Sequence, residues 1–136
     1  MSGERTVFLS LSNVLRIHEN TLAEEGGTSG TRDEGLLASA VEMPQASFGG
    51  EPLHKDLAEM AAAYLFHICQ NHAFVDGNKR AAAFSAVLFL SFNGIPDEAL
   101  PDPFALEDVT ICVASGAMSK AQLAEFFRDN AITRRG

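Results

Sequence analysis

Basic residues are scarce in this chain of 136 residues, which has 10 Lys and Arg against 18 Asp and Glu and a formal net charge of −8. Because phosphate backbones attract clustered Lys and Arg, this balance argues against a nucleic-acid partner and confines any anion site to a local cluster. Cysteine is scarce too. Cys69 and Cys112 form no CxxC pair, and each lies in an apolar stretch where a free, buried thiol is expected rather than a disulfide.

The sequence also has no apolar run near the roughly 20 residues that cross a bilayer. Its first residues lack the basic, apolar and cleavage regions of a signal peptide. We therefore expect a cytoplasmic protein with no membrane partner. The length is typical of one domain, which we predict to span residues 1–136.

Helical periodicity dominates the chain and predicts an all-α fold, a single compact bundle of about six helices. Residues 45–53 contain Gly-Gly and Pro and are predicted to form an exposed loop or hairpin. Prolines at 96, 101 and 103 indicate an acidic linker. The expected helices run from Leu11, capped by Ser10, to Gly26; from Asp33, as cap, to Pro44; and over residues 55–70, 78–93, 106–115 and 121–130, the last with a Ser119–Gln122 capping box.

Two of these helices, over residues 55–70 and 78–93, are apolar nearly all round, as expected of helices surrounded by others. The short polar link between them continues into the second helix, and residues 72–80 read HAFVDGNKR. Gly77 permits a backbone turn with positive φ, and Asn78 is a good N-cap, so the free N–H groups of the second helix point into the bend. Lys79 and Arg80 oppose the helix dipole in its first turn unless an anion is bound, which favours phosphate.

The remaining residues of this motif have functional chemistry as well. His72 can accept a proton near pH 7, which makes it a candidate general base. Asp76 can hold Mg²⁺, which proteins bind through one or two carboxylates together with substrate phosphates and water. Phe74 is expected to fix the loop in the core. The set predicts a site for transfer of a nucleotide phosphate.

The segment HAFVDGNKR resembles the signature of the Doc (death-on-curing) branch of the Fic/Doc, or Fido, family, whose pattern is close to HxFxDGNKR. The similarity covers nearly the whole chain: FLSLSNVLRIHE, GTRDEGLLASAVEMPQASF, DLAEMAAAYLFHICQNH and VASGAMSKAQLAEFF all resemble Doc segments in the same order. The resemblance therefore implies the Fido fold.

The resemblance also implies an activity. Fic-type proteins transfer AMP from ATP to a protein hydroxyl and usually have Gly where this chain has Lys79, whereas in the Doc branch Lys goes with transfer of the ATP γ-phosphate. The implied protein is the toxin of a toxin-antitoxin system, a kinase for a Thr of translation elongation factor Tu that arrests translation. An antitoxin whose disordered part folds as a helix into a surface groove would neutralise it. The alternatives are AMP or nucleotidyl transfer and a catalytically silent binding module.

Matched position by position, the family pattern makes His72 the base that deprotonates the target hydroxyl and Asp76 the Mg²⁺ ligand. Phe74 becomes structural. Ala81 stands where Doc proteins often have Thr, so a hydroxyl that contacts phosphate is missing. The implied binding residues are Gly77, Asn78, Lys79 and Arg80 for the ATP phosphates, and the loop Ser47, Phe48, Gly49, Gly50 and Glu51 for the target, which would add to it as a strand.

Other polar residues have simpler interpretations. The three remaining histidines, His18, His54 and His67, are read as structural. Arg32 is interpreted as ordering the turn before the second helix, with lining of the groove as the alternative. Thr21, Glu25 and Gly26 fit the S/T-xxx-E-G/N pattern of the inhibitory helix in autoinhibited Fic proteins, and we interpret this match as coincidental, because the same segment matches the ordinary first helix of Doc proteins.

Overall fold

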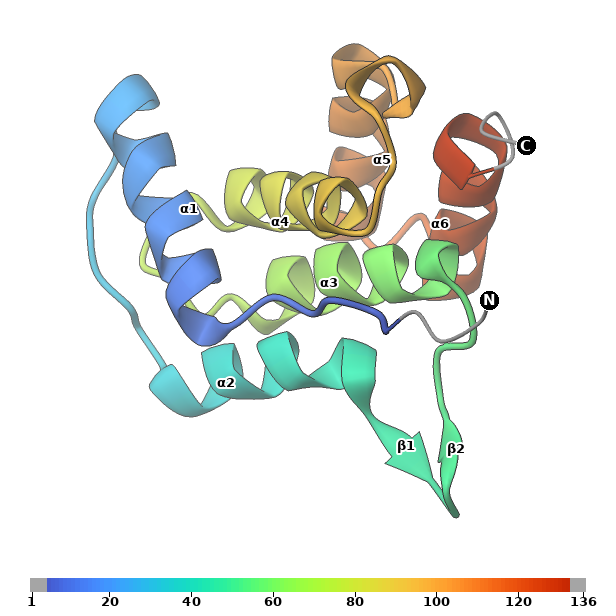
Figure 1. Ribbon diagram of the computed structural model, residues 1–136. Helices are drawn as coiled ribbons and strands as arrows, with labels where there is room; N and C mark the ends of the chain where they lie inside the picture. The colour runs from blue at the N-terminus through green and yellow to red at the C-terminus, as the bar shows by residue number, and fades with distance from the viewer. Residues whose placement is uncertain (1–4, 133–136) are drawn as a thin grey trace.

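The computed structural model describes residues 5–132, and it confirms the predicted all-α class (Figure 1). A hairpin of two strands, each two residues long, is the only sheet in this part of the chain. Three short helical turns join or extend the longer elements: Met43–Gln45, Asp97–Ala99 and Arg128–Ile132. The elements are α1 (Leu11–Glu25), α2 (Glu34–Glu42), β1 (Ser47–Phe48), β2 (Glu51–Pro52), α3 (Leu57–Asn71), α4 (Asn78–Phe92), α5 (Pro103–Ala114) and α6 (Lys120–Phe127).

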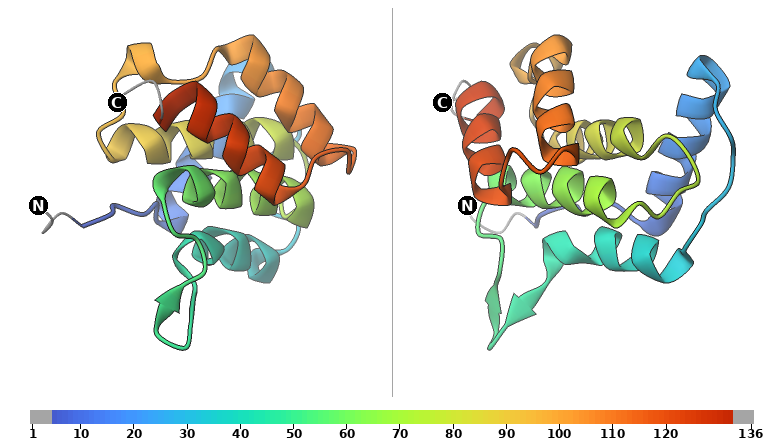
Figure 2. Two further views of the ribbon diagram at one scale, coloured as in Figure 1. Left: turned by 90° about the vertical axis from the view of Figure 1, so that its right-hand side faces the viewer. Right: turned by 180° about the vertical axis from the view of Figure 1, so that it is seen from behind.

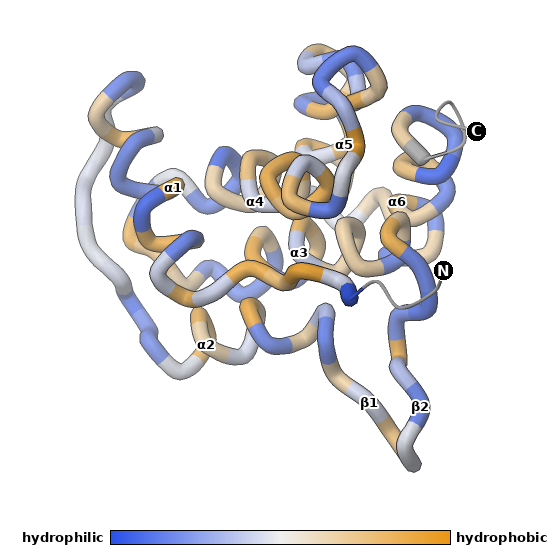
Figure 3. The backbone as a smooth tube through the Cα atoms, viewed as in Figure 1, coloured by the Kyte–Doolittle hydropathy of each residue, from blue (hydrophilic) through white to orange (hydrophobic). Residues whose placement is uncertain are grey.

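Helix α3 lies at the centre, between α2 on one side and α4 on the other, with α6 packed near its N-terminal end (Figures 1 and 2). Four alanines of α3, Ala58, Ala61, Ala62 and Ala63, are completely buried, because neighbouring helices cover several of its faces. Figure 3 shows that the segment before α1 is hydrophobic as well. This segment is fixed to α3 where the Leu9 backbone N–H donates to the buried Tyr64 hydroxyl at 2.8 Å.

Side-chain caps explain why most of the helices begin where they do. Five of the six α-helices have an N-cap side chain that accepts a hydrogen bond from a backbone N–H of the first turn. Two of these caps are the predicted Ser10 and Asp33, and the Ser119–Gln122 capping box is also confirmed. The five caps are Ser10, Asp33, Asp56, Asp102 and Ser119.

Among the helix starts, that of α5 differs most from the prediction, and the helix predicted over residues 121–130 ends as α6 at Phe127. Helix α5 begins at Pro103 and not at Leu106, because Asp102 accepts hydrogen bonds from the N–H groups of Phe104 and Ala105, and proline at the first helical position has no N–H to satisfy. The hairpin prediction for residues 45–53 is correct. Both cysteines are free, as expected, but only Cys69 is buried, whereas Cys112 is partly exposed. Within residues 5–132, no helix has the length and apolar content that a membrane span needs.

A cluster of three basic side chains joins the chain after β2 to α3 and α6. The Lys120 ammonium lies 3.0 Å from Nε2 of His54 and 3.1 Å from Nε2 of His67. Because an ammonium group only donates, both Nε2 atoms accept and both rings are neutral. Burial, followed by the charge of Lys120, lowers the pKa of His67 to about 4 and also lowers the pKa of His54.

The cluster predicts that the fold is less stable in acid. The unfolded chain binds a proton at His67 with a pKa near 6.5 and the folded chain only at about 4, so the unfolded state takes up more protons as the pH falls through this range. We expect the free energy of unfolding, measured by urea titration, to fall by about 1 kcal/mol from pH 7 to pH 5 through this residue, allowing for its partial exposure. A His67→Gln variant should lose less over the same range; an equal loss in both proteins would contradict the assignment.

Candidate active site

His72 ends helix α3 in an unusual backbone conformation. Its φ of 50° and ψ of 45° make it the only non-glycine residue with positive φ among residues 5–132. This left-handed conformation costs a side chain such as histidine of order 1 kcal/mol, so it needs support from its surroundings. The support comes from Arg32, whose guanidinium donates to the His72 carbonyl through Nε at 3.0 Å and through Nη2. The His72 side chain is exposed.

The loop after His72 is paired with the segment before α2 along their backbones. The N–H of Val75 donates to the carbonyl of Gly30 at 3.0 Å. The N–H groups of Arg32 and Asp33 both donate to the carbonyl of Ala73, at 2.6 and 3.0 Å. A single antiparallel bridge lies between these bonds. The polar loop is therefore attached to the body of the protein by backbone groups, although it contains no regular structure of its own.

The Asp76 carboxylate is also held by backbone groups. Its Oδ1 accepts from the N–H of Gly77 at 2.9 Å and its Oδ2 from the N–H of Thr28 at 3.2 Å. At Gly27, where φ is +122°, a Cβ would lie 3.0 Å from Asp76 Oδ2 and 2.9 Å from the Leu22 side chain, so this close approach requires glycine. The carboxylate is thus fixed against the chain that follows α1.

The surroundings of Asp76 suit Mg²⁺. The side chain is exposed, and each of its oxygens keeps a lone pair beyond the one hydrogen bond it accepts. Residues 5–132 contain no group of three or more His, Cys, Asp or Glu side chains that could hold a metal ion. Asp76 is a residue that could hold Mg²⁺ together with phosphate oxygens and water, which is how proteins usually bind this ion beside a nucleotide.

Helix α4 begins without a side-chain cap, unlike the other five α-helices described. The prediction that Asn78 is the N-cap was wrong: Gly77 has this position, with φ 80° and ψ 19°. The Asn78 side chain is engaged with Phe74, since its Oδ1 accepts from the Phe74 N–H and its Nδ2 donates to the Phe74 carbonyl, both at 3.0 Å. What Asn78 can offer a phosphate is its backbone N–H, together with those of the next two residues.

Lys79 and Arg80 follow in the first turn of α4, where both are exposed and no acidic residue accompanies them. Arg80 Nε lies 2.7 Å from Oε1 of Glu25, the last residue of α1, with the two side chains 48% and 42% exposed. The Glu of the Thr21–Glu25–Gly26 pattern, which was interpreted above as a chance match, is therefore in contact with Arg80 in the structure. A carboxylate on Arg80 competes with any anion that Arg80 binds.

The sequence analysis missed the contribution of His18. It lies in α1, 4% exposed, with Nε2 2.6 Å from the Asp76 carbonyl oxygen and its ring stacked on that of Phe74, which is 1% exposed. Thr28 was missed as well. Periodicity placed His18 on the apolar face of α1, and this was the only available signal, because its partners are more than 50 residues further along the chain.

The structure does not bring the hairpin to the motif. The loop Ser47–Glu51 precedes α3 and His72 follows it, so the 15 residues of α3, about 22 Å, separate the two (Figure 1). A target segment that contacts both would have to extend along the protein.

The hairpin carries an exposed apolar side chain, since Phe48 on β1 is 81% exposed.

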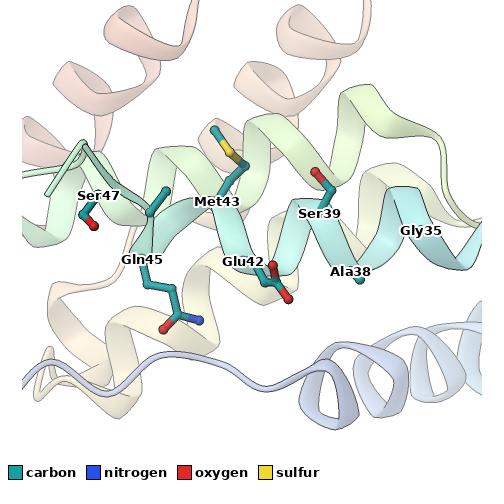
Figure 4. Close-up of a pocket in the computed structure, with 8 residues that line it drawn as sticks. Gly35, Ala38, Ser39, Glu42, Met43, Gln45 and Ser47 are labelled. Carbon is teal, nitrogen blue, oxygen red and sulfur yellow. The ribbon is translucent and has the colours of Figure 1, made fainter. Parts of the chain in front are cut away.

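Two hollows occur elsewhere on the surface. One, of about 680 Å³, lies along α2 and the segment that follows it, with lining residues from Gly35 to Ser47 (Figure 4). The other, of about 360 Å³, lies between α1 and α4. Neither of these two hollows is lined by a residue of the motif 72–80.

Comparison with known proteins shows the family of the chain. The chain belongs to the Fic/DOC family, whose model matches residues 8–90. It falls in the Doc branch: it is 32% identical over 120 residues to the "Protein kinase doc" of Escherichia phage P1, covering 88% of this chain and 92% of that protein. It is 43% identical over 90 residues to the "Toxin Doc" of Mycolicibacterium smegmatis, covering 66% and 69%. The chain is thus a relative of Doc toxins.

The contact between Glu25 and Arg80 predicts that a neutral residue at 25 strengthens anion binding. We expect Glu25→Gln to lower the dissociation constant for Mg·ATP, measured by calorimetry, by up to about five-fold, because a half-exposed ion pair contributes at most about 1 kcal/mol. Glu19→Gln, which removes the same charge from an exposed site on α1, is the control. Equal affinities in both variants would show that Glu25 does not compete for Arg80.

Proposed function

We propose that this protein is a Doc-type toxin that acts as a single domain in the cytoplasm and transfers the γ-phosphate of ATP to a threonine hydroxyl of elongation factor Tu, arresting translation. The observation that carries the proposal is the start of α4, where uncapped backbone N–H groups and the side chains of Lys79 and Arg80 occur together. Phosphoryl transfer depends mainly on positioning and charge neutralisation, and this turn supplies both. The relative named as a protein kinase supports the same chemistry.

In this proposal each residue has one role. His72 accepts the proton of the target hydroxyl while the hydroxyl oxygen bonds to the γ-phosphorus and the bond to the leaving ADP breaks. Asp76 holds Mg²⁺, which supplies charge neutralisation on the phosphates when bound. Lys79, Arg80 and the N–H groups that begin with that of Asn78 bind phosphate oxygens, and Gly77 allows the close backbone approach.

Lys79 favours phosphate transfer over AMP transfer. Fic-type AMP transferases usually have glycine at the matching position, which leaves room for phosphates beside the helix end. Here a long cationic side chain lies in the first turn of α4. It fills space and adds charge at the same point, which supports a nucleotide bound with its γ-phosphate toward the target hydroxyl. Nucleotidyl transfer remains the alternative for the same turn.

The reaction type can be tested with labelled ATP. We expect elongation factor Tu to gain radiolabel from [γ-³²P]ATP and none from [α-³²P]ATP, with a mass increase of one phosphate in the intact protein. His72→Ala should reduce labelling at least 100-fold, since general-base catalysis contributes factors of about 10²–10⁴. Arg80→Ala should also reduce labelling strongly, because it removes a cation that binds the phosphates.

Other outcomes of this experiment point to the alternatives. Label from the α position would make nucleotidyl transfer the activity. If no label is transferred, and expression of the intact chain arrests growth equally with and without these substitutions, the protein is a binding module.

The hollow between α1 and α4 is the groove in which we place the antitoxin helix. Apolar side chains of both helices line it, among them Ile17, Phe84 and Val87, and acidic Glu24 and Asp97 are also among its lining residues. Phe84 is 47% exposed, which is high for a phenylalanine in the middle of a helix. These features suit an amphipathic helix with an apolar stripe and flanking cations. The relative named as a Doc toxin supports an antitoxin partner.

This placement predicts a variant that is toxic but not neutralised. Phe84→Glu should arrest growth as the wild type does, while co-expression of the short protein encoded beside the gene should no longer relieve the arrest. Ile111→Glu on α5 is the matched control, because Ile111 is 50% exposed and does not line the hollow. Relief of arrest in both variants would place the antitoxin elsewhere.

A further inference from the structure

His18 contacts the motif through both its ring face and its ring edge. The ring lies parallel to that of Phe74, with centroids 3.7 Å apart and an interplanar angle of 7°. Its Nε2 is 2.6 Å from the carbonyl oxygen of Asp76. Because a carbonyl oxygen only accepts, Nε2 carries the hydrogen. A single buried side chain of α1 therefore touches two residues of the motif from 56 and 58 positions earlier in the sequence.

The Asp76 carbonyl accepts no hydrogen bond from the helix that follows it. Helix α4 starts at Asn78, and its first intrahelical bond runs from the Ala81 N–H to the Gly77 carbonyl, so the carbonyl of Asp76 lies outside the helix. The peptide that joins Asp76 to Gly77 could rotate if nothing held it. Rotation would move the Gly77 N–H, which donates to the Asp76 carboxylate. It would also change the direction in which the uncapped N–H groups of α4 point.

Two contacts therefore fix the two ends of Asp76. His18 holds its backbone carbonyl, and the N–H of Thr28 holds its carboxylate at 3.2 Å. Both partners come from α1 and the chain just after it. A Cβ at Gly77 would lie 3.4 Å from the His18 ring, which shows how closely the ring follows the turn. Ring stacking on Phe74 alone would need only an apolar or aromatic residue, so the hydrogen bond is the part that requires histidine.

We propose that His18 is a positioning residue for phosphate transfer: it sets the orientation of the Asp76–Gly77 peptide and thereby aims the Asp76 carboxylate and the N–H groups of α4 at the phosphates. This inference rests on the proposed function. His18 itself touches neither phosphate nor target in this role, and it acts on the rate through Asp76.

Two substitutions separate the hydrogen bond from the packing. His18→Phe keeps a ring against Phe74 and removes the donor, whereas His18→Gln keeps an N–H near the position of Nε2 and removes the ring. Thr110→Val is the control for loss of a buried hydrogen bond, because the Thr110 hydroxyl donates to Leu106 within α5, away from the motif. All three are compared with the wild type in the full chain.

We expect His18→Phe to lower kcat for transfer from [γ-³²P]ATP at least ten-fold, with less than a three-fold change in KM for ATP, and His18→Gln to restore most of kcat. Amide hydrogen exchange gives a readout that does not depend on activity: the N–H groups of Gly77 and Thr28 should exchange at least ten-fold faster in His18→Phe than in the wild type. Thr110→Val should change neither quantity, even where it lowers Tm.

The proposal is overturned if His18→Phe matches the wild type in exchange and kcat, or if His18→Gln is as impaired as His18→Phe. Should His18→Phe not fold, the ¹⁵N spectrum of the wild-type His18 ring decides: a proton on Nε2 supports the proposal, and a proton on Nδ1 alone overturns it. A wild type without phosphate transfer refutes the proposed function, while the exchange data still report whether His18 holds the turn.

Discussion

The contact of residues 28–33 with the loop 72–76, made by backbone pairing and by side-chain hydrogen bonds at its two ends, is the feature on which the candidate site depends. Without it, the link between α3 and α4 would be an exposed polar loop with few apolar contacts, and such loops sample many conformations. With it, the left-handed turn at His72 and the carboxylate of Asp76 are both held in place. The pairing also ties the motif to α1, since the paired segment follows that helix directly.

The first turn of α4 is basic, whereas the chain as a whole is acidic. The protein has a formal net charge of −8, yet the first turn of α4 has two cations and no acidic residue. Cations at a helix N-terminus face the positive end of its dipole, which is unfavourable by a few tenths of a kcal/mol each. The contact of Glu25 with Arg80 offsets part of this in the free protein. The first turn of α4 thus brings two cations together on an acidic molecule, with the carboxylates of Asp76 and Glu25 close by.

Local signals were sufficient to predict most of the fold. Helix α1 could be located from Ser10 and from the glycine that ends it, and α6 from its capping box, because these interactions span three or four residues. The start of α5 was missed because Pro103 was interpreted only as a helix breaker, although Asp102 before it was a readable cap. For α4, Asn78 has the chemistry of a cap, but its side chain finds two partners on the Phe74 backbone and Gly77 takes the position instead.

The motif itself could be recognised from nine consecutive residues, but its supports could not. Arg32 acts on His72 across 40 positions, Thr28 on Asp76 across 48, and His18 on Asp76 across 58. No periodicity or capping rule links positions so far apart. Arg32 and His18 act through side chains that are ordinary for a turn and for an apolar helix face, and Thr28 acts through its backbone N–H, so only the folded chain shows which atoms they reach.

The buried alanines of α3 limit how this protein can change. Helices approach closely where their contact surfaces carry only methyl groups, and each of the four alanines is fully enclosed. A larger residue there would push a neighbouring helix outward, and because α3 leads directly into His72, the displacement would also disturb the turn at the candidate site. Substitutions are therefore best tolerated at the exposed positions on the outer faces of α2 and α5, where a new side chain meets mainly water.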